Sequence, residues 1–412
     1  MKRRVVITGV GAVSPIGNTA QELWQNAKDG VCGIDKITSY DTANQKVTLA
    51  GEIKNFNPEE FLNKKEIRKL DRFTQLALVA SQEAFAQSGL DIKKEDAHRC
   101  GVIVSSGIGG LDIIEQEHNR GLEKGFDRVS PFFIPMAISN MAAGSIAIQH
   151  SLKGMCTCVV TACASGTNAV GDAFRYIRDG YGEVMVCGGA ESCITPLGIG
   201  GFTSLRALSE ATDPNRASIP FDKNRDGFVM GEGAGILILE EYEHAVARNA
   251  SIICEVVGYG ASCDAYHMTA PSPDGSGAAS CMQAAVADAG ISPDVVDYIN
   301  AHGTSTPMND QCETAAIKLA FGEHAGKLMV SSTKSMTGHL LGASGAVEAI
   351  LTALAIKDSF VPPTVNYREP DEACDLDIVP NTGRTAKLRY AMSNSLGFGG
   401  HNATILLKKY EV

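Results

Sequence analysis

The sequence predicts an α/β fold built from two similar halves, residues 1–250 and 251–412. Short apolar, β-branched runs alternate with longer helical runs, and this alternation favours sheets covered by helices. Many of the 43 glycines lie in turns flanked by apolar residues, as in folds with tight strand–helix connections. Stretches that start at residues 5, 163 and 186 are echoed in the same order at 254, 342 and 392, which indicates a duplicated unit.

The first half is expected to supply its elements in a regular order. Strands are predicted near residues 4–9, 100–105, 158–160, 183–190 and 234–240, and helices near 19–30, 63–89, 139–147 and 164–177. The first strand is expected to end in a turn at Gly9. The glycines at 9 and 11 are similar to a dinucleotide-binding loop, but Ser14 stands where the third glycine belongs, so that function is disfavoured.

The second half is expected to repeat this pattern. Strands are predicted near residues 254–262 and ending near 301, 333 and 394, and helices from about 310 and over 342–356. At the start of the last helix, glycine takes the place that Cys163 has in the first half.

Composition excludes several classes of function. Hydrophobic residues make up 44% of the chain and charged residues 20%, which is ordinary for a globular protein. The net charge of −11 disfavours nucleic-acid binding, and no apolar run is long enough for a transmembrane helix or a signal peptide. Twelve irregularly spaced cysteines do not form a dense disulfide framework and favour a reducing compartment. We therefore expect a cytoplasmic protein without membrane insertion.

One basic run interrupts this acidic chain, at Lys64, Lys65, Arg68 and Lys69. A solvated helix face is the simpler interpretation of such a cluster. Because the run reverses the sign of the net charge, it also suits a docking surface for an acidic partner.

Cys163 is the candidate nucleophile. It lies where the predicted strand at 158–160 gives way to a helix whose first turn consists of small residues. Unpaired amides at a helix start favour an anion, so we expect a lowered thiol pKa and a larger thiolate fraction. The small neighbours leave room for a substrate.

Two histidines in the second half follow predicted strands. His302 is flanked by hydroxyl residues that include Thr304 and Thr306, and His339 follows Lys334 by five residues. A single histidine is more often structural than catalytic, but strand ends in polar loops are good positions for ligand contact. Glu348 lies on an otherwise apolar helix, and since an unpaired buried carboxylate is costly, Lys334 is its expected partner.

The last glycine-rich loop, residues 397–400, places Phe398 between glycines. A turn anchored by one ring is one interpretation. A mobile gate with backbone amides free to bind an oxyanion is the other.

Taken together, these residues resemble one enzyme family. Residues 161–166, 301–306, 334–339, Asn394 and 397–400 are similar to the matching stretches of the β-ketoacyl-acyl carrier protein synthases, and the likeness covers nearly the whole chain. Residues 105–110 are more similar to the type II condensing enzymes of bacterial fatty acid synthesis than to type I. The resemblance implies a thiolase-like fold with αβαβα layers, usually as a homodimer. It implies no cofactor, because the substrates carry their own phosphopantetheine.

The resemblance also implies a mechanism. Cys163 would hold the acyl chain as a thioester, and malonyl-acyl carrier protein would lose CO₂ to give an enolate. His302 and His339 would stabilise that enolate, which attacks the thioester and extends the chain by two carbons. Lys334 would tune the His339 region, and Glu348 would hold Lys334 in place.

Further residues receive roles from the same resemblance. The amides of Cys163 and Phe398 would form the oxyanion hole. The expected substrate contacts are Ile108, Phe202, Thr269, Thr304, Thr306, Phe398 and Gly399. Acyl carrier protein would dock on the basic run, extended by Arg128 and Arg206. A monovalent cation near Asn300, Glu348 and Asn394 is also implied.

Other functions remain as alternatives. A cysteine hydrolase would use Cys163 with one histidine, and the position of Cys163, 139 residues before His302, is compatible with that arrangement. A local signature of such hydrolases is absent, and a second strand-end histidine favours decarboxylative condensation. A metal site built on Cys156, Cys158, Cys163 and the histidines is disfavoured because no second pair matches Cys156 and Cys158. A catalytically inactive binding subunit is disfavoured because cysteine and both histidines are present.

Overall fold

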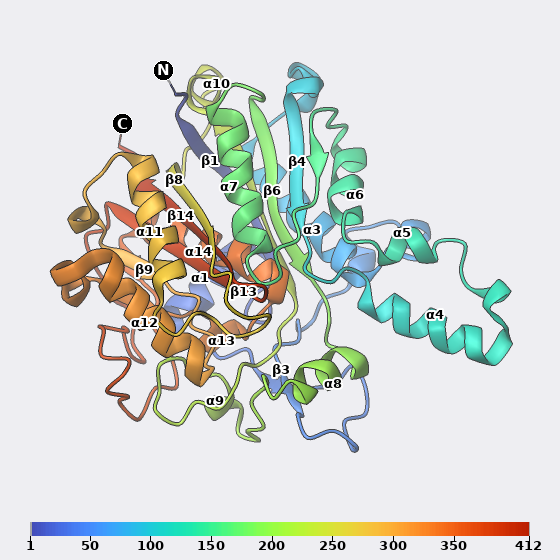
Figure 1. Ribbon diagram of the computed structural model, residues 1–412. Helices are drawn as coiled ribbons and strands as arrows, with labels where there is room; N and C mark the ends of the chain where they lie inside the picture. The colour runs from blue at the N-terminus through green and yellow to red at the C-terminus, as the bar shows by residue number, and fades with distance from the viewer. Residues whose placement is uncertain (1, 412) are drawn as a thin grey trace.

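The computed structural model describes residues 2–411 and contains a ten-stranded mixed sheet (Figure 1). The strand order is β10-β9-β13-β14-β8-β1-β7-β6-β4-β5. The first half of the chain supplies β1 (Val5–Val13), β4 (Cys100–Ser105), β5 (Cys156–Thr157), β6 (Val184–Glu191) and β7 (Gly233–Glu241). The second half supplies β8 (Cys254–Cys263), β9 (Tyr298–Asn300), β10 (Met329–Ser331), β13 (Tyr390–Gly397) and β14 (His401–Lys409). Two small sheets pair β2 (Asp35–Lys36) with β3 (Leu49–Ala50) and β11 (Phe360–Val361) with β12 (Arg384–Thr385).

The two halves of the sheet have the same topology. From the central antiparallel pair β1–β8, each half runs outward through two antiparallel pairs and then two parallel pairs. The order β1-β7-β6-β4-β5 therefore matches β8-β14-β13-β9-β10. This repetition confirms the predicted duplicated α/β fold.

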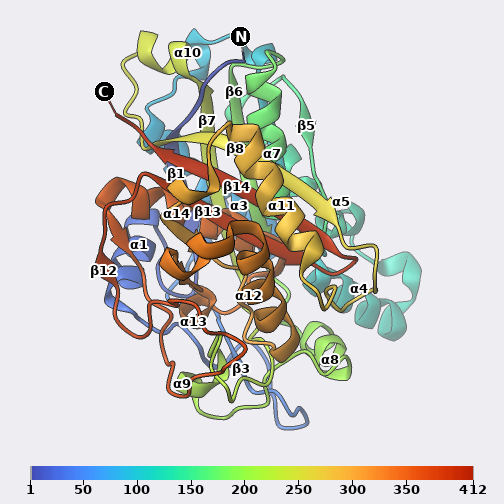
Figure 2. The same cartoon turned by 60° about the vertical axis from the view of Figure 1, so that its left-hand side comes forward.

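Helices form three layers around the strands (Figures 1 and 2). Because β1 and β8 pair over only three residues, the half-sheets diverge, and α7 (Ser165–Arg178) and α14 (Ser344–Asp358) pack between them against strands of both halves. On the outer faces, α3 (Arg72–Ser88) and α6 (Met141–His150) cover the first half-sheet, and α11 (Ser276–Ala289) covers the second, with α12 (Pro307–Phe321) beside it. The result is the layered αβαβα arrangement. Every residue of α14 from position 344 to 356 is buried, which explains its apolar sequence.

The remaining helices lie in the connections between these layers. They are α1 (Ala20–Asp29), α2 (Lys64–Ile67), α4 (Leu111–Lys124), α5 (Phe133–Ala137), α8 (Pro196–Ser204), α9 (Pro214–Ala217), α10 (Tyr242–Ala247) and α13 (Lys334–Thr337). Short 3₁₀ turns occur at Pro58–Glu60, Ile92–Lys94, Ala97–Arg99, Phe126–Arg128, Pro293–Val295, Gly322–Lys327 and Leu341–Ala343. None of the helices in residues 2–411 has both the length and the apolar character needed to cross a membrane.

Three local predictions are wrong, each for a physical reason. The first strand does not turn at Gly9 but continues to Val13, and its glycines are needed because a Cβ at Gly9 or Gly11 would collide with backbone carbonyl oxygens of α3. The helix predicted over 63–89 is two helices, since Asp71 caps a new helix by accepting a hydrogen bond from the Phe73 amide (3.2 Å). Residues 158–160 form no strand, and Val160 is 54% exposed.

Candidate functional site

The turn that carries Cys163 is tightly closed. Ala162 adopts a left-handed conformation with φ of 49°. The Ser165 hydroxyl donates to the Ala162 carbonyl (2.6 Å) and accepts from the Thr161 amide (2.9 Å). These bonds place Cys163 two residues before α7 begins, with its side chain at the wall of a cavity.

The environment of the thiol differs from the prediction. Burial raises the pKa of Cys163 to about 12. The Lys334 ammonium and the backbone amides of Phe398 and of Cys163 itself lower that pKa, but by less than burial raises it. The lowered pKa expected from the helix start is therefore wrong for the unliganded site. The two amides point at the sulfur, which is the arrangement expected of an oxyanion hole.

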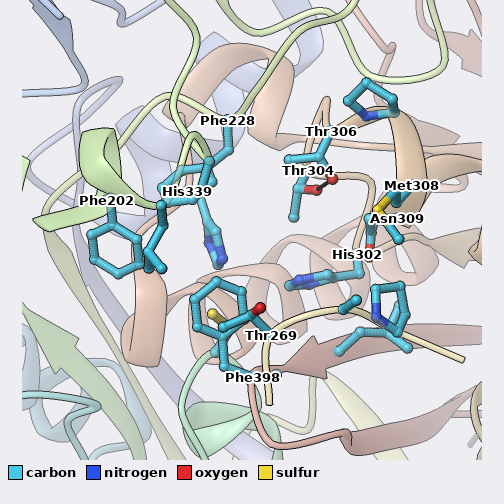
Figure 3. A pocket seen from close by; sticks show the side chains of 18 of the residues that line it. Phe202, Phe228, Thr269, His302, Thr304, Thr306, Met308, Asn309, His339 and Phe398 are labelled. Carbon is cyan, nitrogen blue, oxygen red and sulfur yellow. Dashed lines mark hydrogen bonds between the residues drawn. The ribbon is translucent and has the colours of Figure 1, made fainter. Parts of the chain in front are cut away.

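Both predicted histidines face the same cavity (Figure 3). His302 follows β9, and His339 lies in the turn between α13 and Leu341–Ala343. Their ring centroids are 5.2 Å apart and the rings are nearly perpendicular, at 85°. Burial, together with the positive charge of Lys334, lowers the pKa of both imidazoles well below the usual value, so both are neutral near pH 7.

Lys334 determines which nitrogen of His302 carries the proton. The ammonium lies 3.4 Å from His302 Nδ1 and has only hydrogens to offer. His302 Nδ1 must therefore accept, and the single proton of the neutral ring sits on Nε2. Lys334 is also ion-paired with Glu348, and both side chains are buried.

His339 has one committed nitrogen and one open nitrogen. Its Nδ1 lies 2.8 Å from the Ser344 hydroxyl at the start of α14. Its Nε2 is buried and has no hydrogen-bond partner among the described residues. An unpaired buried nitrogen is costly, so this atom is available for a ligand in the cavity.

The cavity has a volume of about 370 Å³ and receives side chains from both halves. It gathers most of the predicted catalytic and substrate-contact residues, namely Cys163, Phe202, Thr269, His302, Thr304, Thr306, His339 and Phe398, and one predicted docking residue, Arg206. One side is aromatic, with Phe202 centred 6.2 Å from Phe398 and 5.4 Å from Phe228. On the other side the hydroxyls of Thr304 and Thr306 lie 2.9 Å apart (Figure 3). The cavity thus offers an apolar wall and a short polar wall.

Two predicted substrate contacts do not line this cavity in the described chain. Ile108 lies at the end of the loop after β4, is 37% exposed, and donates its amide to Glu191 (3.2 Å). Gly399 donates its amide to the Met268 carbonyl (2.8 Å) and has φ of 87°, a conformation that suits glycine. Their roles toward substrate stay predictions.

The predicted docking residues are exposed but lie on separate elements. Lys64 and Lys65 belong to α2, and Arg68 and Lys69 lie in the turn that leads to α3. The Lys69 ammonium lies 5.3 Å from the centre of the Phe132 ring, which joins this run to the segment before α5. The 3₁₀ turn Phe126–Arg128 carries Arg128, and Arg206 lies at the cavity.

Several cavity residues were missed by sequence reasoning. They are Leu205, Ala207, Asp226, Phe228, Asp264, Ala270, Pro271, Pro307, Met308, Asn309, Leu396 and Asn402. Glu313 was also missed, although its carboxylate accepts the amides of His302 and Gly303 at 2.8 Å each and so fixes the loop after β9. Among the cavity residues, Asp226 lies in a polar stretch, Arg225-Asp226-Gly227, whose composition is typical of a loop.

The residues predicted to surround a monovalent cation fall into two networks. The side-chain amide of Asn300 donates to the backbone carbonyl of Glu348 (3.5 Å). Glu348 Oε2 is buried and has no hydrogen-bond partner among the described residues. Asn394 instead accepts from Thr404 (2.8 Å) and donates to Glu313 (3.3 Å). The unpartnered Glu348 oxygen is compatible with a cation, but Asn394 is already committed elsewhere, so this site stays a prediction.

Comparisons with known proteins give concordant results. Residues 2–245 match the family model of the β-ketoacyl synthase N-terminal domain, and residues 253–368 match that of the C-terminal domain. The chain is 54% identical over 411 residues to 3-oxoacyl-[acyl-carrier-protein] synthase 2 of Synechocystis sp., covering 100% of this chain and 99% of that protein. It is 56% identical over 409 residues to the protein of the same name from Staphylococcus aureus, covering 99% of each.

Solved structures are similar over the full length. A β-ketoacyl synthase from Burkholderia phymatum is 35% identical with a TM-score of 0.92, and 100% of both chains is covered. A type II polyketide ketosynthase, solved in complex with its acyl-carrier protein, is 36% identical with a TM-score of 0.93 and the same coverage.

Proposed function

Because the chain belongs to the β-ketoacyl synthase family, we propose that it is a β-ketoacyl-acyl carrier protein synthase, a condensing acyltransferase of fatty acid biosynthesis. The observation that carries the proposal is the meeting, in one cavity, of a cysteine at a helix start and two neutral histidines. A hydrolase needs one histidine as a base, whereas loss of CO₂ from a malonyl thioester needs donors for an enolate.

In the first half-reaction, Cys163 Sγ attacks the acyl thioester of acyl-acyl carrier protein. The bond from the acyl carbon to the carrier's sulfur breaks, and the thiol proton of Cys163 ends on the departing phosphopantetheine thiolate. Amides of Cys163 and Phe398, which point at the sulfur, are placed to hold the oxyanion of the tetrahedral intermediate.

In the second half-reaction, malonyl-acyl carrier protein loses CO₂ and its electron pair passes into an enolate. His302 Nε2–H donates to the enolate oxygen, and Lys334 keeps this tautomer in place through Nδ1. His339 contributes its open Nε2. The enolate carbon then attacks the Cys163 thioester, which releases the β-ketoacyl product and returns the thiolate for protonation.

The partner is acyl carrier protein, in its acyl- and malonyl-loaded forms. Carrier proteins are acidic, and the exposed basic run at Lys64, Lys65, Arg68 and Lys69 is complementary to them. Arg206 at the cavity and Arg128 are further exposed basic residues that we assign to the docking site. The solved ketosynthase in complex with its own acyl-carrier protein supports this assignment. No further cofactor is part of the proposal, since phosphopantetheine arrives with the substrates.

A homodimer in the cytoplasm completes the proposal. Four large apolar side chains are exposed at 42–78%: Ile134 on α5, Ile138 directly after it, Ile148 on α6 and Val160 beyond the edge strand β5. Such a surface beside an edge strand suits a second copy of the chain. All twelve cysteines in the described chain are free, as in a reducing compartment. Ile138→Glu is expected to yield monomers in sedimentation experiments.

Product analysis tests the proposed reaction. Malonyl- and acyl-acyl carrier protein are incubated with the enzyme, and products are identified by mass. A β-ketoacyl product with one CO₂ per turnover supports condensation, and free acid would indicate a hydrolase. His302→Ala and His339→Ala are expected to retain part of the acylation of Cys163 but to lose CO₂ release. Unchanged CO₂ release in both variants would contradict the assignment.

A further inference from the structure

The carboxylate of Glu191, the last residue of β6, is fully buried beside the site, and all of its contacts in the described chain are with neutral donors. Oε1 accepts from the Ser106 hydroxyl (2.6 Å), the Ile108 amide (3.2 Å) and the Cys193 thiol (3.7 Å). Oε2 accepts from the amides of Gly107 (2.7 Å) and Gly342 (2.9 Å). A buried charge without a counter-ion needs such a complete set of donors, so this carboxylate is built into the fold.

These donors belong to both halves of the molecule. Ser106, Gly107 and Ile108 form the loop after β4 of the first half, whereas Gly342 lies in the 3₁₀ turn that leads into α14 of the second. The close approach needs glycine, because a Cβ at Gly342 would lie 2.7 Å from Glu191 Oε2 and one at Gly107 would lie 2.8 Å from it. Glu191 is therefore a hydrogen-bonded link between two loops that sequence places more than 200 residues apart.

The internal duplication relates the turn that Glu191 binds to the turn that carries Cys163. Gly342 precedes α14 by two residues, as Cys163 precedes α7 by two. In the first half, the amides of Cys163 and Phe398 point at the reactive sulfur and remain available to a substrate oxyanion. In the second half, the corresponding amide of Gly342, together with that of Gly107, binds a carboxylate oxygen of the protein itself.

The turn held by Glu191 lies between His339 and the hydroxyl residue that bonds it, Ser344. His339 precedes Gly342 by three residues, and Ser344, two residues after it, bonds His339 Nδ1 (2.8 Å). Leu341 packs in the same apolar cluster as Cys163. A shift of the Gly342 turn would therefore move His339 relative to the sulfur.

We propose that Glu191 is a positioning residue, whose carboxylate holds the Ser106, Gly107 and Ile108 loop against the Gly342 turn and so sets the distance between His339 and Cys163. This inference rests on the proposed condensation. In this proposal the Glu191 carboxylate touches neither the substrate nor a reacting atom.

Glu191→Gln tests the carboxylate with almost no change of shape. Each carboxylate oxygen faces at least one backbone N–H, so the new NH₂ group must oppose a donor whichever way the amide turns. We expect kcat for condensation to fall about 10–100-fold, while KM for malonyl-acyl carrier protein changes less than about threefold, because positioning rather than binding is lost. In Glu191→Ala, kcat should fall further. Formate, a carboxylate small enough for the vacated space, should then raise the kcat of this variant about tenfold.

Glu240→Gln is the matched control. Glu240 is another buried carboxylate, at the opposite end of the same strand pair, where β7 pairs it with Val184 at the start of β6. It bonds Arg248, His244 and Thr8, and none of these belongs to the site. This variant should melt at a lower temperature yet keep kcat within about twofold and show no response to formate.

Amide hydrogen exchange provides a readout that does not depend on activity. The Gly107 and Gly342 amides should be protected in the wild type, exposed in Glu191→Ala and protected again by formate. A Glu191→Gln enzyme with wild-type kcat, or a Gly342 amide that stays protected in Glu191→Ala, would overturn the inference. If Glu191→Ala does not fold, the Gln variant decides. If the wild type itself gives no β-ketoacyl product, the proposed function fails, and exchange still decides whether Glu191 holds the two loops.

Discussion

Replacing Lys334 with methionine separates the structural and catalytic contributions of the buried ion pair. The side chains of Lys334 and Glu348 are only 1% and 3% exposed, so the carboxylate left by this change has no access to water. One of its oxygens already lacks a partner. Removing one member of a buried pair costs about 3–5 kcal/mol, and we expect the free energy of unfolding to fall by that amount. CO₂ release should also be lost, because His302 Nδ1 no longer has its donor.

The double variant Lys334→Met/Glu348→Leu distinguishes the two effects. It removes both charges, so the free energy of unfolding should return to within about 1–2 kcal/mol of the wild type while CO₂ release stays lost. Chemical denaturation and ¹⁴CO₂ release from malonyl-acyl carrier protein measure the two quantities. NMR titration should also show a raised His302 pKa, since the Lys334 charge lowers it. Recovery of CO₂ release in the double variant would refute the role assigned to Lys334.

Three further predictions use other parts of the molecule. A hydrogen bond to a buried glutamate raises the pKa of His244 to about 9, so its stabilisation is complete below about pH 6.5 and is lost as the pH rises through 9. In His244→Gln, the melting temperature should therefore depend less on pH between about 6.5 and 9 than in the wild type. Lys65→Glu/Arg68→Glu should raise KM for acyl carrier protein about tenfold or more but spare small thioesters; equal losses would exclude this docking surface. Gly11→Ala should cost about 1–3 kcal/mol of unfolding free energy, whereas Gly200→Ala, with open space around it, should be tolerated.

The convergence of the reactive groups could be predicted because of where they lie on their strands and helices. His302 lies two residues after a strand ends, and Cys163 lies two residues before a helix begins. In a layered α/β fold such positions meet at the same edge of the sheet. The pairing of Lys334 with Glu348 could be anticipated for another reason, since a carboxylate on an apolar helix needs a partner.

The sequence does not indicate the roles of residues that act through contacts between separate helices, strands and loops. Glu313 lies on α12 and accepts two amides from the loop that carries His302, but a glutamate within a helix is usually solvated. Gly9 and Gly11 have the sequence of a turn, and their need for glycine arises only from the approach of α3. The break between α2 and α3 depended on one capping side chain, Asp71. These features follow from tertiary contacts, which local patterns do not contain.

The raised pKa of Cys163 indicates that the start of α7 does not serve to stabilise a thiolate, as its position in the sequence suggests, but to bind the oxyanion that forms during the reaction. A standing thiolate there would be cut off from water and would lie near the negative charge of Glu191, which opposes the effect of Lys334. The resting thiol is therefore protonated, and negative charge develops only when a thioester fills the cavity. The amides of Cys163 and Phe398 then meet an oxyanion that was absent before. These hydrogen bonds stabilise the transition state more than the free enzyme. They therefore lower the activation barrier and do not serve to keep a thiolate in the free enzyme.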